Sequence, residues 1–236
     1  MPFATVEAIS ARDGNTLRLK DGREVRLAGV IAANELDGDE AAARRATRAL
    51  DALIAGRTIA LHSRAQASDR YGRITAQVAL VDSEPRWIQA ALVAEGAIRV
   101  APEVGEPACS AALMGIERQA RAKRAGLWAE ARFALQNADD LPALNAAIGR
   151  FAVVDGTVRH VGESGGRLFL DFGRRFSEDF TIVIPREARK AFADAGIDLK
   201  ALKGKRVRAR GVLFPWGGPA VELRKPAALE LLGDGT

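Results

Sequence analysis

Two Asp-Gly dipeptides near the start of the chain, Asp13-Gly14 and Asp21-Gly22, place the strongest constraint on its fold. An Asp-Gly pair between two strand-like runs favours a tight turn, because glycine adopts positive φ angles without steric cost. Residues 5–10, 16–20 and 24–30 flank these pairs. The sequence therefore predicts three short strands joined by tight turns at the start of the chain.

Helix signals follow the third strand. The acidic residues Asp37, Asp39 and Glu40 are suited to cap a helix that ends at Gly56. Its apolar face has helical spacing and comprises Ala43, Ala46, Leu50, Leu53 and Ile54. Strands are predicted at residues 58–62 and 74–81, and further helices at residues 87–95 and 111–125. Five strands, with one helix after the third and others at the end, predict a small closed barrel of the OB type.

The strand pattern restarts after a polar segment that contains proline, residues 133–148, which is predicted to be a linker. Five strand-like segments follow, with a helix at residues 185–195 after the third: residues 151–160, 167–172, 180–184, 206–214 and 220–223. This is again the order of an OB barrel. We therefore predict a mainly β, α+β fold of two tandem five-stranded OB-type barrels, residues 1–132 and residues 149–236.

Positive charge is concentrated in the last third of the chain. Residues 150–236 hold 16 Lys and Arg against 11 Asp and Glu, whereas the residues before them hold 19 of each. This excess indicates an anionic partner for the second barrel. The alternative is an arginine-rich surface that serves only solubility.

Several functional classes are excluded by what the chain lacks. Cys109 is the single cysteine, which excludes an internal disulfide, and His62 and His160 have no partner at the spacing of a zinc site or a catalytic triad. No apolar run approaches the roughly 20 residues that span a bilayer. No export signal precedes the first strand, which favours a cytoplasmic location over an exported mature form.

Three motifs in the first barrel resemble those of one known family. They are Asp13-Gly14-Asn15-Thr16, the stretch of residues 26–34, and Asp69-Arg70-Tyr71-Gly72-Arg73. Together with residues 87–96 and 117–128, they are similar to the thermonuclease, or staphylococcal nuclease-like, family over most of residues 4–130. The resemblance implies that the first barrel carries the helices of a staphylococcal nuclease.

The resemblance also identifies catalytic groups that this chain lacks. In the family, calcium is held by carboxylates at the positions of Asn15 and Ile31, and a glutamate at the position of Asn34 acts as the base. Asn15 still offers a neutral oxygen, Ile31 offers none, and Asn34 accepts no proton. Losing the base alone lowers the rate by about 10²–10⁴. We therefore expect no bound metal and little or no calcium-dependent cleavage, unless Glu35 or Asp13 rebuilds the site.

Two arginines of the family's phosphate site are retained. Arg26 and Arg73 match residues that contact phosphate, and the planar guanidinium suits two phosphate oxygens at once. The alternative is that both arginines are held in internal salt bridges. Arg70 and Tyr71 match positions beside the family's nucleotide pocket, where Tyr71 would either stack on a base or pack on the barrel.

Candidate contacts in the second barrel lie in the loops around its strands. OB barrels bind single strands over strands two and three, with cations on the backbone and rings on the bases. The candidate residues for such contacts are Arg174, Arg175, Phe176 and Trp216. Three phenylalanines are interpreted as core residues: Phe151, Phe169 and Phe180. Three arginines alternate on one strand and predict a solvated or phosphate-binding stripe: Arg206, Arg208 and Arg210.

The sequence thus favours a nuclease relative that binds nucleic acid through both barrels, with single strands preferred, and cleaves it little or not at all. One alternative is an active metal-dependent phosphodiesterase or endonuclease. Another is a protein-interaction scaffold, because barrel grooves also bind peptides. The sequence does not distinguish DNA from RNA, and it assigns no oligomeric state.

Overall fold

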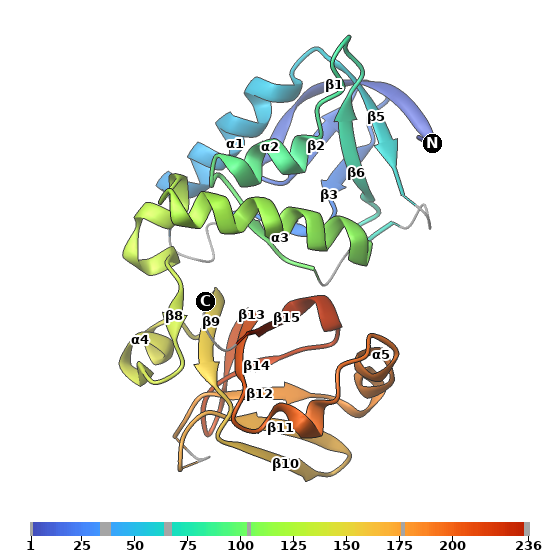
Figure 1. The fold of residues 1–236 in the computed structure, drawn as a ribbon. Helices are drawn as coiled ribbons and strands as arrows, with labels where there is room; N and C mark the ends of the chain where they lie inside the picture. Colours follow the sequence, from blue (N-terminus) through green and yellow to red (C-terminus); the bar gives the residue numbers. More distant parts are fainter. Residues whose placement is uncertain (1, 34–38, 64–67, 103–104, 176–177, 234–236) are drawn as a thin grey trace. The chain divides into compact units, whose positions relative to one another are not determined.

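The computed structural model describes residues 2–33, 39–63, 68–102, 105–175 and 178–233. The chain forms two compact units, residues 1–131 and residues 132–236 (Figure 1). None of the helices in the described ranges combines the length and the hydrophobicity that a membrane crossing requires.

Five strands of the first unit close into a barrel (Figure 1): β1 (Ala4–Asp13), β2 (Thr16–Leu19), β3 (Glu24–Leu27), β5 (Thr58–His62) and β6 (Ile74–Leu80). The order around the barrel is β1-β2-β3-β6-β5. The β3–β6 pair is parallel, and the other neighbouring pairs are antiparallel. The long β1 strand pairs with β5 through its first half and with β2 through its second half. The predicted closed five-stranded barrel is confirmed.

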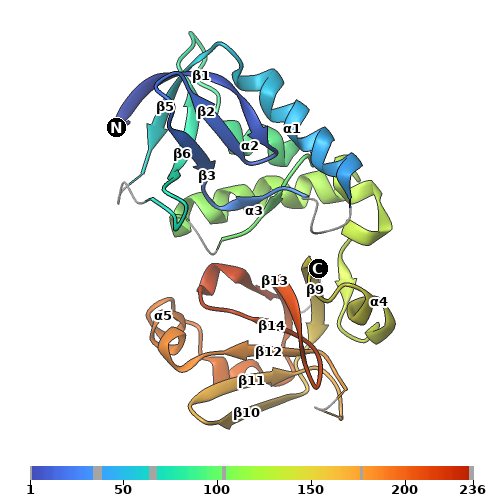
Figure 2. The ribbon, with the colours of Figure 1, turned by 180° about the vertical axis from the view of Figure 1, so that it is seen from behind.

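Three helices complete the first unit: α1 (Glu40–Ile54), α2 (Ile88–Ala94) and α3 (Pro107–Ala122). Figure 2 shows α1 beside β1, and α2 contacts α1, α3 and β6. Between β3 and α1, the short strand β4 (Val30–Ile31) pairs with β7 (Arg99–Val100). A 3-10 helix at Gly126–Ala129 follows α3, and another spans Ala131–Phe133.

The cap of α1 is one of the predicted acids, whereas the buried face of α1 and the start of the last helix differ from the sequence prediction. Asp39 caps α1, because its Oδ1 accepts a hydrogen bond from the backbone N–H of Ala42 at 2.8 Å. Ala42, rather than Ala43, then lies on the buried face of α1. The last helix begins at Pro107 instead of residue 111, since proline is well suited to the first turn of a helix.

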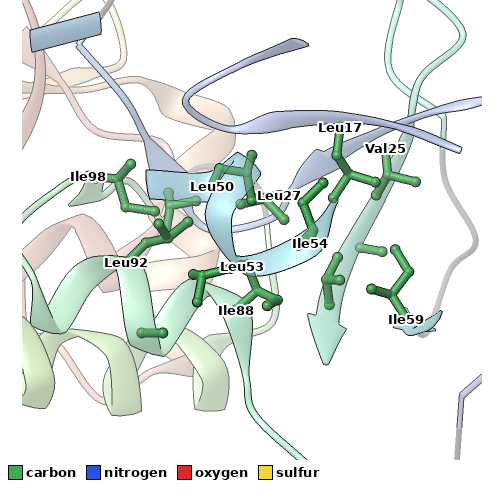
Figure 3. Packing of buried hydrophobic residues seen from close by; sticks show 14 of the residues in the cluster. Leu17, Val25, Leu27, Leu50, Leu53, Ile54, Ile59, Ile88, Leu92 and Ile98 are labelled. Atoms are coloured by element: carbon green, nitrogen blue, oxygen red, sulfur yellow. The ribbon is translucent and has the colours of Figure 1, made fainter. Parts of the chain in front are cut away.

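The core of the first unit lies between the barrel and its helices. Figure 3 shows the side chains that meet there: Leu17, Val25, Leu27 and Ile59 from strands, and Leu50, Leu53, Ile54, Ile88 and Leu92 from helices. Burial of each such side chain contributes about 1.5–3 kcal/mol relative to its exposed state. This core fixes the strands and helices that carry the site described below.

The β1–β2 turn packs closely on α1 at Gly14. A Cβ atom built on Gly14 would lie 2.5 Å from the Cβ of Ala46 and 2.6 Å from the Cβ of Ala32. Only glycine therefore allows the turn and the helix to approach this far. The contact places the first half of α1 beside Asp13 and Asn15.

The second unit contains one eight-stranded sheet: β8 (Gln136–Asn137), β9 (Phe151–Thr157), β10 (His160–Ser164), β11 (Arg167–Asp171), β12 (Thr181–Ile184), β13 (Arg206–Trp216), β14 (Gly218–Glu222) and β15 (Leu229–Leu232). The strand order is β10-β11-β12-β14-β13-β9-β8, and β15 pairs with β13. This unit is therefore mostly β, with a few short helices.

The predicted first strand of this unit, residues 151–160, is divided into β9 and β10. The chain leaves the β9 ladder at Val158, whose N–H donates to the carbonyl oxygen of Lys205 at 3.0 Å. The next N–H, of Arg159, donates to the carbonyl oxygen of Asp171 at 2.8 Å. As a result, β9 pairs with β13, and β10 pairs with β11. The order thus matches that of the first barrel with one strand divided, but the OB type of this unit remains a prediction.

Residues 133–148 are folded parts of the second unit rather than a plain connection. They include β8, which pairs with β9, and α4 (Leu141–Ala146). Ala138 and Leu144 are buried in the second core. Between β12 and β13 lie α5 (Arg189–Asp194) and two 3-10 helices, Arg186–Ala188 and Leu199–Leu202. The first 3-10 helix and α5 lie within the helix predicted at residues 185–195. A last 3-10 helix spans Pro226–Ala228.

Candidate functional site

A cavity of about 570 Å³ lies between the β1–β2 turn, the β3–β4 segment and the first half of α1. Five residues singled out in the sequence line this one cavity: Asp13, Asn15, Arg26, Ile31 and Arg73. They come from segments far apart in the chain, which the closed barrel and the contact at Gly14 bring together. Asn34 and Glu35 lie outside the described residues.

Positive charge dominates the described lining of this cavity. It contains four arginines and two acids: Arg12, Arg26, Arg44 and Arg73, with Asp13 and Glu40. Glu40 forms an ion pair with Arg44 one helical turn later, at 2.8 Å. Arg12 pairs with Glu24, which does not line the cavity. Arg73 likewise pairs with Asp69, so the excess of arginines is largely balanced by acids in and around the cavity, and the case for an anion depends on Arg26.

Arg26 is the lining arginine that has no ion pair among the described residues. It lies on β3, opposite Thr16 of β2 and Thr75 of β6, and it is half-buried. Within the described ranges, no hydrogen bond or ion pair joins its guanidinium to another residue. Its planar donor fork is therefore suited to bind two oxygens of an anion in the cavity.

Arg73, by contrast, is held in an internal salt bridge. Its Nε donates to Oδ2 of Asp69 at 2.7 Å, and its second nitrogen lies 2.6 Å from the same oxygen. Burial raises the pKa of Asp69, but hydrogen bonds from the Arg73 side chain and from the Tyr71 and Arg73 backbone outweigh it, so the pKa lies below its ordinary value. Of the two arginines, Arg73 thus forms the internal salt bridge that the sequence left open, and this salt bridge holds its side chain in place at the cavity wall.

Arg70 and Tyr71 lie on the turn that Asp69 stabilises, because Oδ1 of Asp69 accepts the N–H of Tyr71 at 2.9 Å. The ring of Tyr71 is 65% exposed. The guanidinium carbons of Arg70 and Arg73 lie 4.8 Å and 5.1 Å from its centroid. Neither Arg70 nor Tyr71 lines the cavity. Tyr71 therefore packs against its neighbouring cations and still presents an exposed ring.

The two described positions at which the family carries metal-binding carboxylates do lie in the cavity. The backbone N–H of Asn15 donates to Oδ1 of Asp13 at 2.9 Å, and its Nδ2 lies 3.4 Å from the carbonyl oxygen of Val30. Asn15 thus stabilises the turn as a donor. Ile31 is half-buried on β4 and contributes only hydrocarbon to the cavity.

The described part of this donor set does not fit calcium, which binds six to eight oxygen atoms, several of them from carboxylates. Asp13 and Glu40 are the acids of the described lining, and Glu40 already pairs with Arg44. Among the described residues, no group of three or more His, Cys, Asp or Glu side chains is placed to hold a metal ion. The nearby arginines add positive charge, which disfavours the binding of a metal cation.

The candidates of the second unit are exposed to different degrees. Arg174 and Arg175 are exposed on the segment between β11 and β12, and Arg175 pairs with Glu178 at 3.5 Å. Trp216 ends β13 and is 45% exposed. Phe176 lies outside the described residues.

Two interpretations for the second unit are corrected by the structure. The arginines of β13 form ion pairs within the unit: Arg206 and Arg208 with Asp155, and Arg208 and Arg210 with Glu230. They alternate with opposite charges of β9 and β15, so they do not form a free stripe for phosphate. Phe169 is only half-buried and stacks on Trp216, whereas Phe151 and Phe180 are buried as predicted.

Sequence reasoning missed Arg12 and Arg44 as lining residues. Arg12 directly precedes the Asp-Gly turn, and Arg44 lies one turn into α1. The signal for Arg44 was its spacing of four residues from Glu40, but its place beside the turn depends on the close approach at Gly14.

A closed five-stranded barrel completed by α-helices, with a cavity lined by arginines, defines an α+β unit built on an OB-like barrel. Residues 24–130 match the family model described as "Staphylococcal nuclease homologue". The chain therefore carries a staphylococcal nuclease homologue domain in its N-terminal half, as the resemblance indicated. A comparison with curated proteins gave no match.

Proposed function

We propose that the first unit binds the phosphate backbone of nucleic acid, in particular of single strands, and does so without calcium-dependent cleavage. The observation that carries this proposal is the position of Arg26. It lines a cavity of about 570 Å³ with no partner among the described residues, next to Ile31 where the family has a metal-binding carboxylate.

The physical argument compares the two possible occupants of the cavity. The oxygens of a phosphate would accept hydrogen bonds from the guanidinium groups of Arg26 and Arg73. Such charge-assisted hydrogen bonds are stronger than hydrogen bonds between neutral groups. A calcium ion would instead need carboxylates that Asn15 and Ile31 do not supply. The same lining that favours an anion therefore disfavours the metal on which the family's hydrolysis depends.

Binding is tested by fluorescence anisotropy with a labelled single-stranded oligonucleotide in rising salt. Affinity should fall as salt rises, because each neutralised phosphate releases counterions. Arg26→Gln should weaken binding about 10- to 100-fold, as expected for loss of hydrogen bonds to a charged group. Arg57→Gln is the matched control, since Arg57 is an exposed arginine of the same unit that pairs with Asp82 at 3.6 Å. Equal effects of the two substitutions, or affinity that ignores salt, would refute the proposed site.

Cleavage is tested on the same oligonucleotide with calcium and with a chelator. The wild-type chain should show no chelator-sensitive turnover. The combined variant Asn15→Asp, Ile31→Asp and Asn34→Glu restores the family's carboxylates and should bind calcium in calorimetry. Calcium-dependent cleavage by the wild-type chain would show instead that this protein is an active nuclease.

A further inference from the structure

A second cavity, of about 310 Å³, lies on the sheet of the second unit. Strand register brings its residues together: His160 of β10 lies opposite Asp171 of β11, which lies opposite Thr181 of β12. Phe169 lies two residues before Asp171 on β11, and Trp216 comes from the end of β13. The cavity thus combines an aromatic wall with a polar group.

The aromatic wall is formed by Trp216 and its neighbours. Its indole stacks on Phe169 with ring centroids 6.4 Å apart and an angle of 25° between the planes. Phe214 meets it edge-on at 6.4 Å, and the guanidinium of Arg167 lies 5.5 Å from its centroid. These contacts hold the indole in a fixed orientation although 45% of the residue is exposed. A rigid, exposed ring is the feature that a planar ligand needs for stacking.

The polar group is the imidazole of His160, which the buried carboxylate of Asp171 holds in one orientation. Nδ1 of His160 lies 3.1 Å from Oδ2 of Asp171, and Oγ1 of Thr181 donates to Oδ1 of Asp171 at 3.1 Å. Both carboxylate oxygens of Asp171 therefore have a partner within the second unit, and the residue is only 5% exposed. An acid that accepts from one ring nitrogen fixes the orientation of the imidazole. The hydroxyl-bearing Ser164 lines the same cavity.

A glycine contact joins the turn after Trp216 to the segment between β11 and β12. A Cβ atom on Gly218 would lie 2.3 Å from the carbonyl oxygen of Glu178 and 2.5 Å from that of Asp179. The turn after Trp216 therefore packs directly on the β11–β12 segment. The same segment carries the exposed Arg174 and Arg175. Cationic side chains thus extend from a loop that touches the tryptophan hairpin.

We propose that this cavity binds one unpaired base of a nucleic-acid strand. The base stacks on Trp216, and its edge forms hydrogen bonds with His160 and Ser164. A base within a duplex is covered on both faces by its neighbours, so the site selects single strands. The identity of the ligand rests on the proposed function of the first unit, whereas the site itself belongs to the second.

The test compares two probes on the full chain by fluorescence anisotropy: an oligothymidine and an abasic oligonucleotide with the same number of phosphates. The wild-type chain should prefer the oligothymidine about tenfold or more, the scale expected for stacking of a base on an aromatic ring. Trp216→Ala should remove this preference and leave the affinity for the abasic strand unchanged. Trp216→Phe should retain most of the preference, and Val212→Ala, an exposed apolar residue of the same strand, should retain all of it.

Each outcome separates the two proposals. Binding of both probes with equal affinity would overturn the base site and leave the backbone site of the first unit intact. A preference for oligothymidine that needs Trp216, without any effect of Arg26→Gln, would support the base site and refute the first-unit proposal. Failure to bind either probe would refute both. Tighter binding of thymidine monophosphate than of the oligothymidine would assign the site to free nucleotides and overturn the strand proposal.

Discussion

Replacement of Gly14 by alanine tests whether the close packing of the β1–β2 turn on α1 builds the anion cavity. The added Cβ would lie 2.5 Å from the Cβ of Ala46 and 2.6 Å from that of Ala32. Non-bonded carbon atoms rest about 3.5–4.0 Å apart, so the turn and the helix must separate by roughly 1 Å. Both neighbours are Cβ atoms fixed to the backbone and cannot rotate away.

The expected loss of stability is at the upper end of the range for overpacking, about 3 kcal/mol. The separation also moves Arg44 of α1 away from Asp13 and Asn15 of the turn. Affinity for a single-stranded oligonucleotide should therefore fall together with stability. Gly22→Ala is the control for a purely conformational effect, because Gly22 has φ +86° and no atom within 4 Å of its added Cβ. That variant should lose about 1–2 kcal/mol and bind normally.

Urea unfolding followed by tryptophan fluorescence measures these changes. The chain has three tryptophans, Trp87, Trp128 and Trp216. In a Trp216→Phe background, the two that remain belong to the first unit, so the signal reports that unit alone. A free energy of unfolding for Gly14→Ala within about 0.5 kcal/mol of the parent would show that the turn relaxes without cost and would refute the argument.

Three further predictions concern single side chains. Asp69→Asn should destabilise the first unit by about 1 kcal/mol at pH 7. The pKa of Asp69 is lowered in the folded state, so its ion pair stabilises the unit only while the carboxyl is ionised. In urea titrations, the difference in unfolding free energy between wild type and variant should therefore vanish as the pH falls below the ordinary aspartate pKa of about 3.9. A difference that persists at lower pH would contradict this prediction. Leu144→Ala should destabilise the second unit by about 2–5 kcal/mol, because Leu144 is fully buried. Urea unfolding monitored by Trp216, in a background without the other tryptophans, measures this loss. An unchanged free energy of unfolding would indicate that residues 133–148 are only a linker. Asp155→Ala should cost the same unit roughly 3 kcal/mol, because it leaves Arg208, 12% exposed, without one of its two acids; a loss below 1 kcal/mol would show that Glu230 suffices.

The sequence predicted most of the first unit because its signals are local. Asp-Gly turns and alternating apolar residues mark the strands, and Gly56 follows the end of α1. In the second unit, the division of the strand at residues 151–160 depends on hydrogen bonds to Lys205 and Asp171. Such partners lie far along the chain, so no local pattern revealed the break.

The candidate site was predictable where a motif carried it and not where packing did. Arg26 and Arg73 were identified from the resemblance, and the structure places both in one cavity. Arg12 and Arg44 were missed because only the contact at Gly14 brings them together. Phe169 was assigned to the core because alternation along a strand does not reveal which of the two faces is covered.

The parallel pairing of β3 with β6 has a consequence for how the anion cavity assembles. Val25 pairs with Ile74 and Arg26 with Thr75, so this pairing joins the segments that carry Arg26 and Arg73, the two arginines that line the cavity. A partly synthesised chain that lacks β6 has neither this pairing nor the cavity. An anion bound to both arginines, as proposed for this cavity, would connect the two strands, and its binding free energy would stabilise only the closed barrel.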